Sequence, residues 1–259
     1  MQLDEHMTAY EQLKISVVIP TADRGDLLQR SIHSVFQQSV SALEVILVDN
    51  GVSNACFYDY GEGLCVRVIR TSPRIGPGRA RNIGAIEAAG DLVAFLDDDD
   101  LWCPDYLEHV LQKFEKVEAD AVLGLLMRQS EGAEAVPYKS FPDDPEKQRR
   151  IFYSNPGFGG QNLTVRRDVF LEFGGFDESM PASEDRDLAA RMLLAGKVLV
   201  PQSKAVAILW DHTGGRARHS LLKGNFAFIK KHWRSMRYHE LFRALTVLCK
   251  RYLFLALRR

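Results

Sequence analysis

The chain has 259 residues, of which 46% are apolar and 26% are charged. That length allows one large domain or two small ones, and the apolar fraction excludes a disordered chain. The four cysteines form no CxxC pair, and their low density excludes a disulfide-stapled scaffold and favours a reducing, cytoplasmic location. We expect no secretory signal in residues 1–14 and no spanning helix, because no stretch reaches roughly 18 apolar residues.

The net charge of −1 hides an uneven distribution of charge along the chain. Residues 212–259 hold 12 lysines and arginines and one acidic residue, whereas residues 1–211 hold 21 basic and 33 acidic residues. A basic tail on an acidic body favours anionic partners. A membrane surface, a nucleic acid and a phosphorylated ligand are the candidates.

Short apolar strands and amphipathic helices alternate through the first hundred residues. We predict strands at 15–19, 44–48, 66–69 and 92–96, and helices at 26–38 and 79–89. This alternation predicts an α/β fold with a mostly parallel, doubly wound sheet. Ligands bind beyond the carboxyl ends of the strands in such sheets, where Pro20, Thr21, Asp49 and the aspartates at 97–100 would meet.

The rest of the chain has less regular patterns. We predict a helix at 106–117, a strand at 121–127 and a polar excursion at 130–145. A second helix is predicted from 183 or 184 to 194, followed by two late strands at 198–200 and 205–210. From residue 225 onward the chain is expected to be helical and basic.

Four consecutive aspartates, Asp97 to Asp100, directly follow an apolar strand. Carboxylates this close repel one another, and a divalent cation relieves the repulsion. Hard cations such as Mg²⁺ and Mn²⁺ prefer carboxylate oxygens. A solvated acidic turn is the alternative, but the position after a buried strand favours a metal site.

Five segments together resemble the family 2 glycosyltransferases with the GT-A fold. They are "ISVVIPTADR" (15–24), "VDNG" (48–51), "GRARNIG" (78–84), "VAFLDDDDLWCP" (93–104) and "GGFDESMPASEDRDLAARMLLAG" (174–196). They occur in family order and cover about residues 15–212. The resemblance implies a polar extension at 1–14, a GT-A domain at 15–215 with a nucleotide half (15–104) and an acceptor half (105–215), and a basic loop with amphipathic helices at 216–259.

The resemblance implies a nucleotide and metal site in the first half. Asp97 and Asp99 match the family's D-x-D pair: Asp97 would face the ribose, or the metal through water, and Asp99 would bind Mn²⁺ or Mg²⁺ directly. A run of four aspartates also permits a shift by one residue, which leaves the direct ligand open. The remaining residues assigned to the nucleotide are Pro20, Thr21, Arg24, Asp49, Arg81 and Asp98. Residues 50–52 depart from the family pattern that follows the base-binding aspartate.

The resemblance also implies catalytic and acceptor residues in the second half. Asp185 matches the catalytic base, with Glu184 beside it; the alternative is a pair of acids capping a helix N-terminus. His212 is either a third metal ligand or a loop histidine. The residues assigned to the donor or acceptor sugar are Gln161 and Asp100. Apart from the resemblance, Arg216 and Arg218 flank a glycine-rich stretch, which predicts a basic loop that closes over the diphosphate; a solvated turn is the alternative.

The activity implied is a metal-dependent, inverting transfer of a sugar from a nucleotide donor, most simply a UDP-sugar, to a hydroxyl of a glycan or lipid-linked acceptor. Two alternatives are a non-catalytic nucleotide-sugar or membrane-binding module and a sugar nucleotidyltransferase. The latter ordinarily has a glycine cluster after the first strand, which residues 20–24 lack.

The basic tail also has apolar residues at helical spacing, namely Leu241, Leu245, Leu248, Tyr252 and Leu255. That combination is typical of a helix lying on an anionic membrane surface, which would place the protein at the inner face of the cell membrane. The alternative is a helix packed on the domain with a basic outer face. We expect no nucleic-acid partner.

Overall fold

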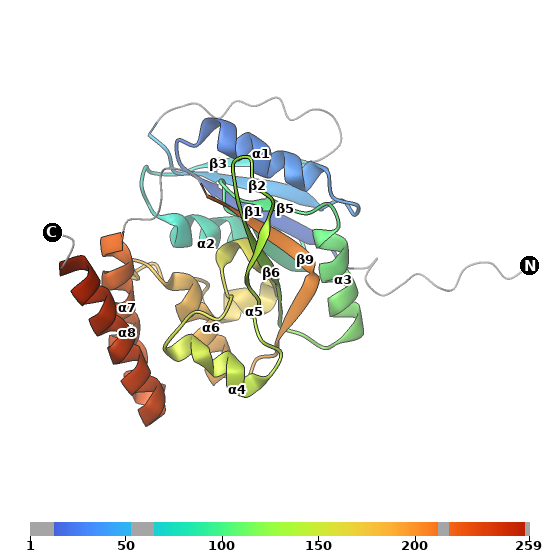
Figure 1. Cartoon of the computed structure of the whole chain (residues 1–259). Helices are drawn as coiled ribbons and strands as arrows, with labels where there is room; N and C mark the ends of the chain where they lie inside the picture. Colours follow the sequence, from blue (N-terminus) through green and yellow to red (C-terminus); the bar gives the residue numbers. More distant parts are fainter. Residues whose placement is uncertain (1–12, 53–64, 212–217, 257–259) are drawn as a thin grey trace, which may run out of the picture.

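A computed structural model of the chain describes residues 13–52, 65–211 and 218–256 (Figure 1). Within these ranges nine strands form one sheet in the order β3-β2-β1-β4-β8-β6-β9-β5, and β7 pairs with β6. The strands are β1 (Ile15–Thr21), β2 (Glu44–Asp49), β3 (Val66–Arg70), β4 (Leu92–Phe95), β5 (Leu101–Trp102), β6 (Ala121–Ser130), β7 (Val136–Lys139), β8 (Leu163–Arg166) and β9 (Leu199–Asp211). The α-helices are α1 (Gly25–Phe36), α2 (Pro77–Glu87), α3 (Tyr106–Lys116), α4 (Pro145–Gln148), α5 (Arg167–Glu172), α6 (Glu184–Leu194), α7 (Arg218–His232) and α8 (Tyr238–Ala256), with 3₁₀ turns η2 (Arg149–Phe152), η3 (Gly160–Asn162) and η4 (Trp233–Ser235).

Helices cover both faces of the sheet, which explains the continuous apolar runs of its first strands. β1 and β2 are buried at every position, as expected for parallel strands enclosed on both sides. The face that carries Val17, Ile19 and Leu47 packs against α1 and α3. The opposite face, with Val18 and Phe95, packs against α2, α5 and α6. The predicted α/β class is therefore confirmed.

The first half of the sheet is entirely parallel, whereas the second half is mixed. β3, β2, β1 and β4 are parallel neighbours. β8 then pairs antiparallel with both β4 and β6, whereas β6 and β9 are parallel. The carboxyl ends of β1, β2 and β4 consequently lie at one edge.

Two predicted segments differ from the structure. The excursion at 130–145 contains β7, which pairs antiparallel with β6. The strand has only four residues and includes Pro137, which is tolerated on an edge strand but argues against a strand in the sequence. The late strands predicted at 198–200 and 205–210 are one strand, β9. A register shift opposite Gly124 and Leu125 interrupts its pairing with β6, and the polar residues at this irregularity hid the continuity of the strand.

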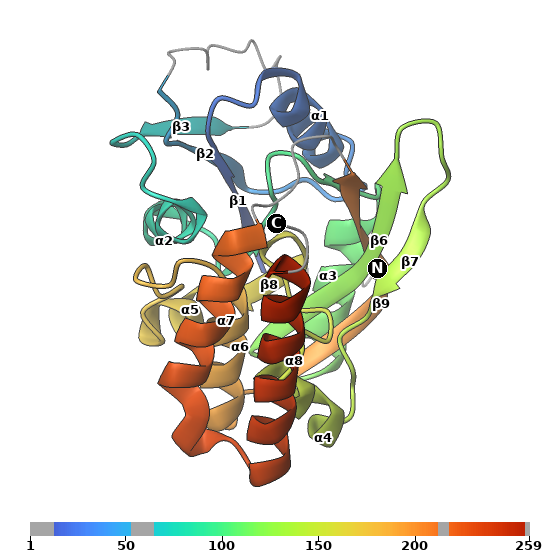
Figure 2. The same ribbon diagram turned by 60° about the vertical axis from the view of Figure 1, so that its left-hand side comes forward.

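The basic tail forms two helices that lie side by side on the flank away from α3 (Figures 1 and 2). α7 starts at Arg218, earlier than predicted, and Phe228 joins the core. α8 is held to η2 by Glu240, which accepts hydrogen bonds from Arg149 Nε and Nη2, both 2.7 Å long. Within the described ranges, every helix is too short or too polar to cross a membrane.

Candidate active site

Three strand ends and the loops after them form the candidate site. Thr21 at the end of β1 is in register with Asp49 at the end of β2. The Asn50 side-chain amide donates a hydrogen bond to the Thr21 carbonyl oxygen at 2.9 Å. The backbone N–H of Ala22 donates to Asp98 Oδ2 at 3.3 Å. The residues predicted to share this edge do lie together, and Pro20 is buried within β1.

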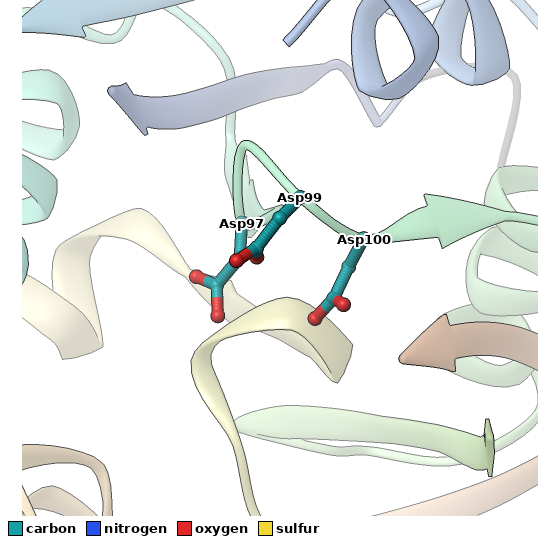
Figure 3. A group of neighbouring side chains, drawn as sticks. All are labelled: Asp97, Asp99 and Asp100. Carbon is teal, nitrogen blue, oxygen red and sulfur yellow. The ribbon is translucent and has the colours of Figure 1, made fainter. Parts of the chain in front are cut away.

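An acidic cluster of Asp97, Asp99 and Asp100 follows β4. Their side chains leave the turn on the same side (Figure 3), and one carboxylate oxygen from each lies within 4.8 Å of the others. Carboxylate oxygens of this number and spacing fit a hard divalent cation such as Mn²⁺ or Mg²⁺. Asp100, assigned from sequence to the sugar, thus belongs to the cluster. Its Oδ1 also accepts a 3.0 Å hydrogen bond from Trp210 N, which ties the cluster to the end of β9.

Asp98 turns away from the acidic cluster toward the loop after β1. Arg24 lies 3.8 Å from Asp98 through Nε and 3.5 Å from Asp99 through Nη2. Burial raises the pKa of Asp98 to about 6, and the charge of Asp99 adds to the rise, while Thr21 and Arg24 oppose it. Asp98 therefore connects the acidic turn to the loop that begins α1.

Both carboxylate oxygens of Asp49 have partners. Arg70 Nη1 donates to Asp49 Oδ2 at 2.5 Å, and the backbone N–H of Gly51 donates to Oδ1 at 2.9 Å. Arg70 is not among the residues predicted for the site. No sequence pattern marks it, because it lies beside Asp49 only through the register in which β2 and β3 pair.

Arg81 connects the acidic cluster with the start of α6. Its side chain is buried; Nη2 forms a short ion pair with Asp97, and Nη1 lies 3.4 Å from Glu184 Oε1. Burial alone would lower the pKa of Arg81, but the charges of Asp97, Glu184 and Asp185 raise it above its ordinary value. One cation therefore neutralises carboxylates from both halves of the site.

The segment that leads into α6 is held by Asn82 near its beginning and has a left-handed residue just before the helix. Ser183, just before the helix, adopts a left-handed conformation with φ of 69°. Asp185 Oδ1 accepts the Arg186 N–H at 2.7 Å, as an acid in the first turn of a helix does. Asn82 pairs with the backbone of Phe176 through two 2.8 Å hydrogen bonds. Arg81 and Asn82, adjacent in α2, thus anchor the two parts of the 174–196 segment.

The remaining assigned residues fall into two groups. Gln161 is buried in η3, and its backbone oxygen accepts a 2.9 Å hydrogen bond from Trp102 Nε1. His212 and Arg216 lie outside the described residues. Arg218 is the first residue of α7, but its side chain is not among those described.

The sequence matches the family model described as "Glycosyl transferase family 2" over residues 16–174, well over half of the chain. A Haemophilus influenzae protein named "Uncharacterized glycosyltransferase" is 28% identical over 181 residues, which cover 69% of this chain and 62% of that protein. The chain thus spans less than two thirds of that relative's length.

Two solved structures share the fold at low sequence identity. S. aureus TarS 1–349 in complex with UDP-GlcNAc aligns with a TM-score of 0.67 and 18% identity, covering 91% of this chain and 72% of that one. GalNAc-T7 with UDP, GalNAc and Mn²⁺ aligns with a TM-score of 0.68 and 18% identity, covering 84% and 48%. These likenesses confirm the GT-A fold, and the family match shows that the chain belongs to glycosyltransferase family 2.

Proposed function

We propose that the chain transfers a sugar from a UDP-linked donor to an acceptor hydroxyl with the help of a divalent cation. The observation that carries the proposal is the acidic cluster at the sheet edge, joined through Arg81 to the first turn of α6. The likeness to the TarS structure in complex with UDP-GlcNAc and to the GalNAc-T7 structure with UDP, GalNAc and Mn²⁺ supports a nucleotide-sugar donor for this fold.

The donor would lie along the carboxyl ends of β1, β2 and β4. Asp97, Asp99 and Asp100 would hold Mn²⁺ or Mg²⁺, which when bound offsets the negative charge of the departing diphosphate. Asp49 would accept a hydrogen bond from the base, with Arg70 and the Gly51 N–H fixing its carboxylate. The other residues proposed for the donor are Pro20, Thr21, Arg24 and Gln161, and the loop residues His212, Arg216 and Arg218 would complete the metal and diphosphate contacts.

Asp185 would act as the general base of the transfer. It would take the proton of the acceptor hydroxyl while that oxygen bonds to the anomeric carbon and the bond to the diphosphate oxygen breaks on the opposite side, which inverts the configuration. The positive end of α6 keeps a carboxylate in its first turn ionised. The neighbouring charge of Arg81 favours the same form.

We also propose an anionic membrane surface as a partner and a lipid-linked glycan as one class of acceptor. α8 presents exposed apolar side chains at helical spacing, with Tyr238, Phe242 and Leu245 four and three residues apart and Tyr252 two turns further on. Basic residues lie along α7, α8 and the turn between them, namely Lys230, Lys231, Arg234, Arg237, Arg243, Lys250 and Arg251. Apolar burial and attraction to anionic lipid would act together there, at the cytoplasmic face of a membrane.

Titration calorimetry with UDP and Mn²⁺, beside an assay of UDP release from a panel of UDP-sugars, tests the activity. We expect Asp99→Ala to lose metal-dependent UDP binding. Asp185→Asn should keep binding and lose about 10²- to 10⁴-fold in turnover, the usual contribution of a positioned base. Unchanged turnover in Asp185→Asn would contradict the assignment of Asp185 as the base. Failure of the wild-type chain to bind UDP with Mn²⁺ would overturn the proposed function.

A further inference from the structure

α7 packs directly on the chain that leads into the candidate base. A Cβ added to Gly224 would lie 2.5 Å from the carbonyl oxygen of Ala182 and 2.8 Å from its carbonyl carbon. Only glycine allows α7 this close to the backbone, because a methyl group would overlap the Ala182 carbonyl. Ala182 and the left-handed Ser183 immediately precede the helix that carries Asp185.

The next residue of α7, Asn225, holds Arg186. Its buried side chain accepts a 2.9 Å hydrogen bond from Arg186 Nη1 through Oδ1 and donates to the Leu221 carbonyl through Nδ2. Arg186 Nε donates to the Ile151 carbonyl, and the guanidinium lies over the Phe228 ring at 3.9 Å. Arg186 is therefore held from η2 on one side and from α7 on the other.

Packing alone does not account for an arginine at this position. Arg186 is 5% exposed. Its Nη2 is a buried donor that has no hydrogen-bond partner among the residues that the structure describes. Such a group costs stability, and an apolar side chain of similar size would usually be more stable there. Burial lowers the pKa of Arg186 to about 9, and the negative charge of Asp185 opposes that fall. The cation therefore lies close enough to Asp185 to interact with its charge.

We propose that Gly224 and Asn225 are positioning residues for Asp185: Gly224 acts through the backbone at Ala182, and Asn225 acts through Arg186 in the first turn of α6. The inference rests on the proposed function, because it concerns the orientation of the candidate base. The C-terminal helices then form part of the acceptor side of the site as well as a surface for a partner. α7 has a second attachment to α6, through Asp187 to Lys231 at 2.8 Å and His232 at 2.7 Å, so a change at Asn225 leaves the helix attached.

Three variants of α7 separate positioning from folding. Asn225→Leu removes the acceptor for Arg186, Asn225→Asp retains one, and Gly224→Ala inserts the overlapping methyl group. Lys223→Ala, at an exposed position beside them, is the control. Turnover is measured as the rate of UDP release from the UDP-sugar that the wild-type chain uses fastest. Binding is measured as the affinity for UDP in the presence of Mn²⁺. Amide hydrogen exchange measures the order of the backbone at residues 182–188.

We expect Asn225→Leu and Gly224→Ala to lower kcat about tenfold or more and to accelerate exchange in 182–188, since a tenfold effect needs only about 1.4 kcal/mol. UDP affinity should stay within about twofold, and Asn225→Asp and Lys223→Ala should resemble the wild type. Unchanged kcat in Asn225→Leu, with or without faster exchange, would overturn the positioning role. Retained turnover in Asp185→Asn would instead overturn the base assignment, whatever the exchange data show.

Discussion

Arg81 is the residue on which the two halves of the candidate site depend. It pairs with Asp97 after β4 and with Glu184 at the start of α6, positions 87 residues apart along the chain. The guanidinium suits this role because its fork of N–H groups can serve two carboxylates at once, whereas an ammonium is a point charge. The charges of these carboxylates offset the cost of burying the guanidinium and hold the pKa of Arg81 above its ordinary value.

Arg81→Lys should lower the free energy of unfolding by about 1.5–3 kcal/mol, the contribution of one hydrogen bond to a charged group. It should also reduce turnover, because lysine can serve only one of the two acids. Chemical denaturation and the UDP-release assay measure the two effects. Arg79→Lys is the matched control: Arg79 lies two residues before Arg81 in α2, its side chain is 55% exposed, and its pairing with Glu178 is a surface contact. Equal stability of the two variants would contradict the bridging role.

At the scale of elements, the junction of α6 and α7 depends on one buried acid. Asp187 is fully buried and contacts Arg191 Nε at 2.8 Å, Lys231 Nζ at 2.8 Å and His232 Nε2 at 2.7 Å. Burial alone would raise the pKa of Asp187, but the hydrogen bonds from His232 and Lys231 and the charge of Arg191 lower it well below its ordinary range. The ionised form is therefore the one that stabilises the fold.

Asp187→Asn should cost about 3–5 kcal/mol of stability at neutral pH, as expected when one partner of a buried ion pair is removed. Because the folded pKa is lowered, this stabilisation is complete above the unfolded pKa of about 3.9 and is lost as the pH falls toward the folded pKa. The stability difference between wild type and variant should therefore narrow below about pH 4. Denaturation curves across pH measure it, and Glu87→Gln, in an exposed pair with Arg67, is the control. A difference that does not change with pH would contradict the assignment.

At the scale of the whole molecule, the tail helices have two distinct surfaces. The inner side of α8 is anchored by the buried pair of Glu240 with Arg149 and by buried Ala244. The outer side leaves Phe242 72% exposed and Tyr252 62% exposed. The helix thus packs on the domain, which was one of the two predictions made from the sequence. It also presents the exposed apolar and basic groups that the other prediction, contact with an anionic membrane, requires.

The full chain should bind vesicles that contain phosphatidylglycerol, and binding should weaken as salt screens the basic groups. Phe242→Ser should weaken binding about tenfold, because burying a phenylalanine side chain contributes roughly 1.5–3 kcal/mol. Ile86→Ser, which changes an exposed apolar side chain in α2, should leave vesicle binding unchanged. Vesicle flotation measures the binding of both variants. Equal binding by the two variants, or none by the wild type, would contradict the proposed membrane contact.

The sequence by itself determined the alternation of strands and helices in the first half and the position of the acidic turn after β4. These features are local: a run of apolar β-branched residues is a buried strand wherever it lies, and strands linked through helices bring their carboxyl ends to one edge. The helix predicted from 183 or 184 to 194 also placed Asp185 in its first turn, where α6 has it.

Only the tertiary structure decided which side chains meet across that framework. Arg70 reaches Asp49 because β2 and β3 pair in one register, Arg81 lies between Asp97 and Glu184, and Asn225 faces Arg186. None of these partners is a local neighbour, so no periodicity or spacing encodes them. The pairing of β7 and the continuity of β9 were not predicted for the same reason. The polar or exposed residues of these strands owe their extended conformation to backbone hydrogen bonds with β6, and their side chains do not indicate that partner.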